Sequence, residues 1–314
     1  MALAITPPRF SRTSQSRGSR AFTLVELLVA ISVIALLMGA LVPALSGGYA
    51  RAKELGDANG IRQLVMGYHQ FSAQRADALL VGYYAQDPGY KLDDTLGGKV
   101  VKGLPRQRYP WRLASFLDAG LRGTFLVGQQ EDFLDEVPAP GTSDRDWWQY
   151  RVSTLPSFGI NAHFLGGYKA NAPGIEAGSP SYVKPPSYKV VKMMSRVSNP
   201  SRFIAFGSAR GEDWNPTGGG ATIAQGWYLV ESPALGDLGP FGGGKLGPWD
   251  AAPYSDSAHP ERYGNIDPRY RGRMLIGHVD GHVDALTPED ARDMTLWSDD
   301  AARSAERDWK PAGY

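Results

Sequence analysis

Four side chains that could bind a metal ion or move a proton alternate near the C-terminus of the chain. They are His278, Asp280, His282 and Asp284. On one continuous β-strand, residues two apart project from the same face of the sheet. All four would then form a cluster suited to a hard metal or to catalysis.

A hairpin is the alternative that we favour for the same stretch. Asp-Gly between apolar flanks is a strong signal for a two-residue turn, here Asp280-Gly281. In that register Val279 faces His282 and His278 pairs with Val283, so the two histidines lie on opposite faces. The cluster then dissolves, and the sequence predicts neither a catalytic residue nor a metal site here.

Other motifs for chemistry are incomplete or missing in the sequence. There is no Gly-x-Ser-x-Gly elbow, and residues 242–245 lack the spacing and the following Ser or Thr of a phosphate-binding loop. His69, His163 and His259 are isolated, and none belongs to a recognisable ligand set. These patterns favour a protein without enzymatic activity.

The composition limits the class of protein. The 314 residues include 38 Gly, 23 Pro and no Cys, which predicts many turns and short strands and excludes disulfides and thiolate metal sites. The net charge is +1 without a basic stripe, so we expect no nucleic-acid partner. The run Trp147-Trp148 with Tyr150 is a sugar-stacking candidate, although a buried aromatic cluster is the commoner outcome.

A long apolar segment lies near the N-terminus. Over residues 22–45 only Thr23, Glu26 and Ser32 are polar. As a helix, these 24 positions would be about 36 Å long, enough to cross a hydrocarbon core of about 30 Å. The preceding residues 1–21 contain four arginines and no acid, which predicts a cytoplasmic N-terminus and an extracytoplasmic remainder.

The acid Glu26 within residues 22–45 distinguishes the possible interpretations of this apolar segment. An uncleaved signal anchor, or a secretory signal peptide cut near residues 40–46, explains the length and the arginines. A charge at that depth in lipid costs at least about 2.5 kcal/mol on insertion scales. Neither of these two interpretations explains why Glu26 is there.

The residues Ala-Phe-Thr-Leu-Val-Glu-Leu-Leu-Val from Ala21 to Val29 resemble the cleavage and methylation motif of type IV pilins and type II secretion pseudopilins. The resemblance implies that a prepilin peptidase cuts before Phe22 and methylates the new amine. Glu26 then lies at the fifth mature position and Pro43 at the twenty-second, as in the family. Ala21 stands where the family usually has Gly before the cut, which predicts slower cleavage.

The physical chemistry of the segment fits this resemblance. In a filament core, the Glu26 carboxylate can pair with the N-terminal amine of Phe22 in a neighbouring subunit, which offsets the cost of burying a charge. Pro43 removes a helix hydrogen bond and is expected to bend or loosen the helix. Glu26 and Pro43 are therefore the expected assembly residues.

Beyond residue 45 the pattern changes to that of an amphipathic helix. Apolar residues recur three or four positions apart, at Leu55, Ala58, Ile61, Leu64, Val65, Tyr68 and Phe71. We expect an α+β, pilin-like fold in which a bent helix over about residues 22–74 packs on an antiparallel sheet with long loops.

The expected organisation has four parts. These are a basic leader (1–21), a membrane or filament-core helix (22–45), its amphipathic continuation (46–76) and an extracytoplasmic α+β unit (77–314). Within the last part the patterns predict a short helix over 109–117, a strand over 203–206, loops over 209–220 and 231–258, and a final helix from Thr287.

The C-terminal stretch resembles an element described mainly in large secretion-system-like pilins of planctomycetes and verrucomicrobia. That element has a His, nine residues and then Asp-Gly, usually followed by His-Val. Asp280, Gly281, His282 and Val283 match it, but Tyr270 occupies the position of the first His. A role for that family histidine, metal binding included, is therefore not expected here.

Together these features predict a structural subunit that assembles through its N-terminal helix into a type II secretion pseudopilus or a type IV pilus-like filament. The expected partners are prepilin peptidase, other pilin or pseudopilin subunits and inner-membrane lipid, which the chain crosses once. No cofactor is expected, although a structural Ca²⁺ in a loop stays open because Asp and backbone carbonyls are abundant. The alternative is an envelope binding module or hydrolase that uses the pilin signal only as an anchor.

Overall fold

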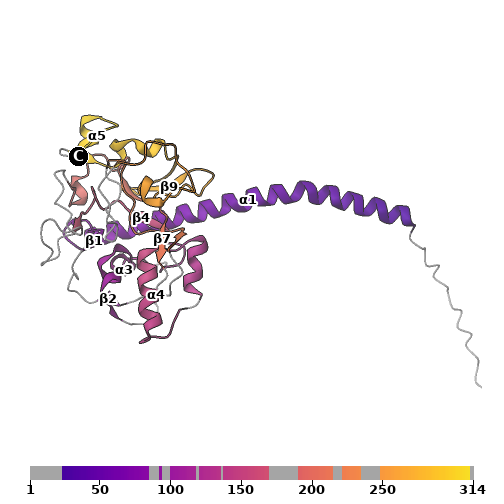
Figure 1. The fold of residues 1–314 in the computed structure, drawn as a ribbon, viewed down its shortest axis with the longest axis horizontal. Coiled ribbons are helices and arrows are strands. Elements are labelled where there is room, and N and C mark those ends of the chain that lie inside the picture. The colour runs from indigo at the N-terminus through magenta and orange to yellow at the C-terminus, as the bar shows by residue number, and fades with distance from the viewer. Residues whose placement is uncertain are drawn as a thin grey trace, which may run out of the picture. The chain divides into compact units, whose positions relative to one another are not determined.

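The computed structural model consists of one long helix, several short helices and short strands (Figure 1). The residues that it describes are 23–84, 92–93, 100–117, 120–135, 137–169, 190–214, 221–234 and 248–311. The chain divides into two units, Met1–Arg51 and Ala52–Tyr314. All the strands described lie in the second unit.

The long helix is α1 (Leu24–Ala73), with 50 residues. It begins at Leu24 because Thr23 and Glu26 cap its first turn reciprocally. The Thr23 N–H donates to the Glu26 carboxylate at 2.9 Å, and the Glu26 N–H donates to the Thr23 hydroxyl at 3.2 Å. The long helix expected over about residues 22–74 is confirmed.

A four-stranded antiparallel sheet forms the centre of the second unit, with the strand order β10-β9-β6-β4. Its strands are β4 (Phe158–Ile160), β6 (Ile204–Ser208), β9 (Met274–His278) and β10 (Val283–Leu286). The strand expected over residues 203–206 is thus present as β6. Every residue of β4, β6 and β9 is buried, so these strands form the core of the unit.

The part of α1 that belongs to the second unit packs on this sheet. Ile61, Leu64, Val65 and Tyr68 have no exposed surface, and the Tyr68 ring meets the ring of Phe206 in β6 edge-on at 5.7 Å. These residues are four of the seven apolar positions predicted for the amphipathic helix. The expected fold class, α+β with a long helix on an antiparallel sheet, is therefore confirmed.

Short elements complete the second unit. The helices are α2 (Leu104–Gln107), α3 (Tyr109–Ala114), α4 (Ser143–Thr154) and α5 (Asp299–Ser304), with 3-10 turns at η1 (Gly128–Leu134), η2 (Met194–Arg196), η3 (Pro260–Tyr263), η4 (Asp290–Arg292) and η5 (Met294–Leu296). The paired strands outside the central sheet are β1 (Tyr83–Tyr84) with β5 (Tyr168–Lys169), β2 (Leu92–Asp93) with β3 (Val100–Val101), and β7 (Gly211–Trp214) with β8 (Ala221–Ala224).

Two sequence predictions for this unit need correction. The loop expected over residues 209–220 contains β7, which pairs with β8 in an antiparallel hairpin. The helix expected from Thr287 is replaced by η4 and η5, and α5 starts only at Asp299. Thr287 does cap the N–H of Asp290 at 3.2 Å, but Asp293 then takes an extended backbone with ψ 103° and ends the turn. The short helix expected over residues 109–117 is confirmed as α3.

Gly60 and Gly56 lie one turn apart on α1 and make a matched test of its packing. A Cβ at Gly60 would overlap the carbonyl oxygen of Gly123, whereas a Cβ at Gly56 would have no atom within 4 Å. We expect Gly60→Ala to lower the free energy of unfolding by about 1–3 kcal/mol, because overpacking shifts the backbone. Gly56→Ala is expected to raise it by about 0.5–1 kcal/mol, because Ala is the better helix former. Denaturant unfolding of the full chain in detergent measures both, and equal destabilisation by the two variants would contradict this packing.

Candidate functional site

β9 and β10 form a hairpin whose loop has three residues, Val279, Asp280 and Gly281. The His278 N–H donates to the His282 carbonyl at 3.0 Å, and the Gly281 N–H donates to the His278 carbonyl at 2.9 Å. Gly281 has φ +96° at the last loop position, where a three-residue hairpin loop requires a left-handed residue. The predicted hairpin is present, but the predicted two-residue turn is wrong by one residue.

The packing of Val279 explains this difference. Its side chain is buried, and its N–H donates to the Phe203 carbonyl at 3.0 Å. Its carbonyl accepts a hydrogen bond from Nε2 of His69 in α1 at 2.5 Å. These contacts hold Val279 in the loop, and the register moves by one so that His278 lies opposite His282. The expectation that the two histidines lie on opposite faces is therefore wrong.

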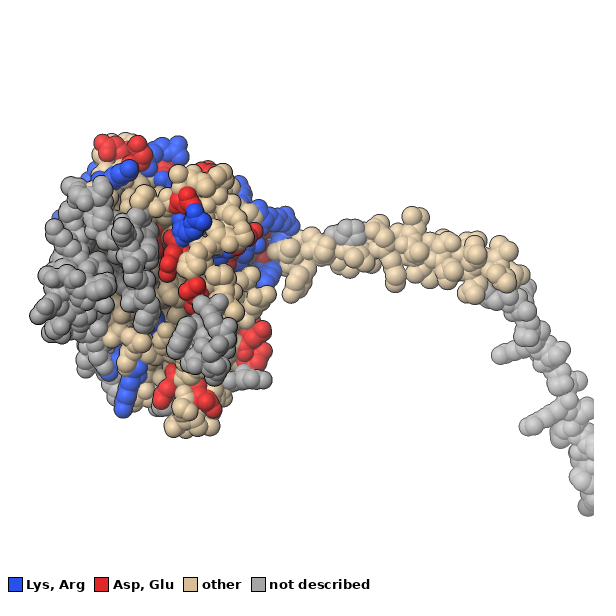
Figure 2. Space-filling view, viewed as in Figure 1, with Lys and Arg blue, Asp and Glu red and all other residues tan. Residues whose placement is uncertain are grey.

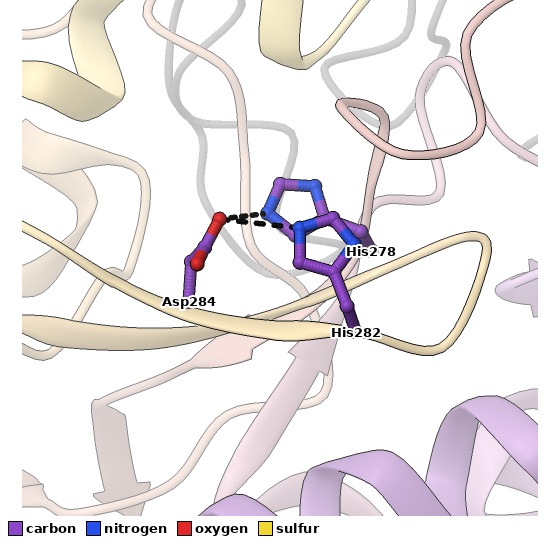
Figure 3. A group of neighbouring side chains, drawn as sticks. All are labelled: His278, His282 and Asp284. Carbon is purple, nitrogen blue, oxygen red and sulfur yellow. Dashed lines mark hydrogen bonds and ion pairs between the residues drawn. The ribbon is translucent and has the colours of Figure 1, made fainter.

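The observed register brings together His278, His282 and Asp284 on one face (Figure 3). Oδ2 of Asp284 lies 3.3 Å from Nε2 of His278 and 3.2 Å from Nε2 of His282. The two imidazole rings are parallel to within 8°, with centroids 4.1 Å apart. Burial lowers the pKa of His278, and the neighbouring His282 lowers it further. The cluster that was expected to dissolve is thus present.

Asp280 lies beside this cluster and orients one of its rings. Its Oδ1 lies 2.6 Å from Nδ1 of His282 and 3.1 Å from the backbone nitrogen of the same residue. The hydrogen bonds to His282 keep the pKa of Asp280 below its ordinary value, although desolvation acts in the opposite direction. The Asp280 carboxylate therefore accepts a hydrogen bond from Nδ1–H of His282, and Nε2 of the same ring faces Asp284.

The other three histidines lie apart from this cluster. His69 binds the loop carbonyl described above, and Nε2 of His163 lies 3.5 Å from Glu231 in the fully buried core. His259 is partly exposed, and its Nε2 lies 2.7 Å from Glu212. Among the described residues, the group with metal-ligand spacing is His278, His282 and Asp284.

The aromatic run on α4 has two different environments. Trp148 is buried, and its Nε1 donates to the Phe133 carbonyl at 2.6 Å. Trp147 and Tyr150 stack on each other with centroids 5.1 Å apart, and both line an open groove of about 900 Å³ together with residues between 100 and 105. The prediction that the whole aromatic run is buried is therefore wrong, because only Trp148 of these three residues joins the core.

Tyr270, at the position of the histidine in the resembled C-terminal element, binds α1. Its hydroxyl donates to Oδ2 of Asp57 at 2.8 Å, and both side chains are buried. This pair joins residues 213 positions apart in the sequence. Sequence reasoning missed it because neither residue carries a local signal for so distant a partner.

The apolar part of α1 contains the acid singled out from the sequence. The described side chains from Thr23 to Val42 are all exposed, and α1 is long and apolar enough to cross a membrane. On the face drawn in Figure 2 this segment is tan, whereas acidic and basic side chains gather over the second unit. The N–H and the hydroxyl of Thr23 both donate to one carboxylate oxygen of Glu26 at 2.9 Å. Glu26 is thus part of the cap of a helix whose first part is largely apolar.

The predicted processing residues Ala21 and Phe22 lie outside the described part of the chain. Position 43 lies within α1, but the side chain of Pro43 is outside the described side chains. The roles expected for these three residues therefore stay predictions.

Comparison with known proteins gives one match. Residues 16–42 match the family model of the prokaryotic N-terminal methylation motif. No curated protein and no solved structure shows a significant match to the chain. The chain thus carries a type IV pilin-like signal, and the apolar start of α1, which overlaps this motif, is that of a membrane-anchored, envelope-associated protein. The motif points to a structural pilin-like protein.

The buried Asp57 makes the stability of the fold depend on pH. Burial raises its pKa above the ordinary 3.8, and this outweighs the hydrogen bond from Tyr270 and the charges of Arg269 and Lys53, while Glu131 raises the pKa further. An acid with a raised folded-state pKa contributes stability below its unfolded pKa and loses it as the pH rises through the folded pKa. We expect Asp57→Asn to match the wild type near about pH 3 and to become the more stable of the two toward about pH 7.

Denaturant unfolding across this pH range measures the difference between the two proteins. Asp308→Asn changes an exposed side chain and serves as the control, with an unchanged pH profile expected. If the difference in the free energy of unfolding between Asp57→Asn and the wild type shrinks as the pH rises, the raised pKa of Asp57 is contradicted.

Proposed function

We propose that this chain is a pilin-like structural subunit that catalyses no reaction. A prepilin peptidase cuts it before Phe22, and the mature protein assembles through α1 into a type II secretion pseudopilus or a type IV pilus-like filament. The observation that carries this proposal is the methylation motif over residues 16–42, which runs directly into α1.

The exposed apolar surface of the first unit supports assembly through the helix. Its leucine, isoleucine and valine side chains lie open to the surroundings, from Leu24 at 81% exposure to Leu45 at 62%. Such a surface requires lipid or other apolar helices around it. Before assembly the inner membrane covers it, and after assembly the helices of neighbouring subunits do so.

Glu26 supplies the specific contact in this proposal. It is the one acid among residues 22–45. After cleavage the new amine of Phe22 carries a positive charge, and a neighbouring subunit's Glu26 is the available counter-charge in the apolar core. Pairing offsets the desolvation of both groups and sets the axial position of one helix against the next.

Substitution at Glu26 tests this pairing and can be separated from the helix cap. Glu26→Gln removes the charge but keeps a side chain that completes the cap. We expect it to lower incorporation into the filament by about tenfold or more, because a charge-assisted hydrogen bond contributes about 1.5–3 kcal/mol and 1.4 kcal/mol is tenfold. Glu26→Val should be at least as defective.

Ser32→Ala is the matched control, because Ser32 is another polar position of the apolar segment and its hydroxyl bonds only locally, to the Leu28 carbonyl at 2.7 Å. Its incorporation should equal that of the wild type. Sheared filaments and membrane fractions, probed for the subunit, give the measurement. Normal incorporation of Glu26→Gln would overturn the pairing.

The mature N-terminus tests the processing step. Mass spectrometry of the protein from its native membrane should find N-methylated Phe22 as the first residue. Ala21→Gly should leave less uncut precursor than the wild type, because Gly is the usual residue before the cut. An intact Met1 or a cut within residues 40–46 would contradict the processing class.

A further inference from the structure

The hairpin cluster has a geometry that the proposed function does not use. His278, His282 and Asp284 lie together there (Figure 3), and each offers one ligand atom within 4.8 Å of the other two. We infer that these three side chains bind a divalent transition-metal ion, with Zn²⁺ as the ion that fits best.

The distances between the ligand atoms agree with such a site. Zinc bonds to His nitrogen and carboxylate oxygen are about 2.0–2.2 Å long, so neighbouring ligands of a tetrahedral ion lie roughly 3.4 Å apart. Oδ2 of Asp284 lies 3.3 Å from Nε2 of His278 and 3.2 Å from Nε2 of His282. The two imidazole rings are parallel to within 8°, so at least one ring has to rotate for both nitrogens to bind the same ion in their ring planes.

The hydrogen bonds leave acceptor atoms facing each other. Asp280 accepts a hydrogen bond from Nδ1 of His282, and in the tautomer with its proton there Nε2 carries the lone pair that would bind the ion, 3.2 Å from Oδ2 of Asp284. His278 has a side-chain exposure of 3%, and neither of its nitrogens makes a hydrogen bond of normal geometry. Such buried polar atoms carry a free-energy penalty, and a cation bound at Nε2 would remove the penalty for that nitrogen.

Residues around the cluster orient its ligands as in known metal sites. Histidine ligands commonly give their second ring N–H to a carboxylate or a backbone carbonyl, which fixes the ring and its tautomer. Asp280 takes this position beside His282 at 2.6 Å.

The outer side of the cluster is open. His282 and Asp284 have side-chain exposures of 41% and 54%, so solvent reaches the ion's remaining position. Three protein ligands and a water molecule complete a four-coordinate zinc ion. Gly277 faces Ile61 and Val65 of α1. Successive residues of a strand face opposite sides of the sheet, so the neighbouring His278 and its cluster lie on the face away from α1.

The ligand types select among metal ions. Two imidazoles and one carboxylate suit Zn²⁺, Co²⁺ and Ni²⁺, whereas Ca²⁺ and Mg²⁺ take oxygen ligands in larger number. A bound ion would join β9 to β10 next to the loop and so stiffen the hairpin. The structural Ca²⁺ left open by the sequence is not the ion for which this site is suited.

Metal titration of the full chain tests the inference. The protein is purified in detergent through a tag without histidines, treated with a chelator, and titrated with ZnCl₂ by calorimetry. We expect one Zn²⁺ per chain, a Co²⁺ derivative with visible absorption bands, and no competition from excess Ca²⁺. Failure of the wild type to bind Zn²⁺ at micromolar concentration would overturn the site.

Variants locate the bound ion. Asp280→Asn should lower the Zn²⁺ affinity by about 10–100-fold, because it removes the hydrogen-bond partner of a ligand. His282→Ala and Asp284→Asn change partly exposed ligands, and each should lower the affinity further. His259→Ala is the matched control, because His259 is equally exposed at 40% and lies 2.7 Å from Glu212. Unchanged affinity in His282→Ala, or an equal loss in His259→Ala, would place the ion elsewhere and refute the assignment.

Discussion

The close contact between α1 and the central sheet is the constraint on which the rest of the second unit depends. Ile61 and Val65 approach Gly277 of β9 so closely that a Cβ there would lie 3.0 Å from both side chains. The interior is packed like a crystal, so the helix cannot take this position unless that strand lacks a side chain there. Tyr270, which precedes β9, and Val279, which follows it, are hydrogen-bonded to Asp57 and His69 of α1. The hairpin and the helix therefore determine each other's position.

The parts of the fold that follow from local pattern were predictable from the sequence. The spacing of Ile61, Leu64, Val65 and Tyr68 identified the helix face that is buried, and the length of the apolar segment identified the helix that carries it. The same spacing included Leu55, which remains 55% exposed. Periodicity describes one helix and carries no information about where its partner surface begins. The contacts of Asp57 and Gly60 depend on distant segments and have no local signature.

The hairpin shows why the candidate site was harder to predict than the fold. The Asp-Gly pair indicated a turn correctly, but a two-residue and a three-residue loop both accommodate that pair. The choice depends on Val279, whose backbone is bound by Phe203 and His69 from other parts of the unit. A shift of one residue reverses the face of every side chain in a strand. The tertiary contacts of one residue, Val279, therefore separate a hairpin with scattered histidines from one that gathers His278 beside His282.

The long sequence separation of the contacts on α1 has a consequence for biogenesis. The partners of Asp57 and His69 lie 213 and 210 residues further along the chain. Asp57 and His69 therefore lack these native partners until residues 270 and 279 have been synthesised, although Tyr68 of the same helix meets Phe206 earlier. Contacts of such high sequence separation form slowly. Under the proposed function the globular unit crosses the membrane, and this delay favours crossing before the hairpin has closed on α1.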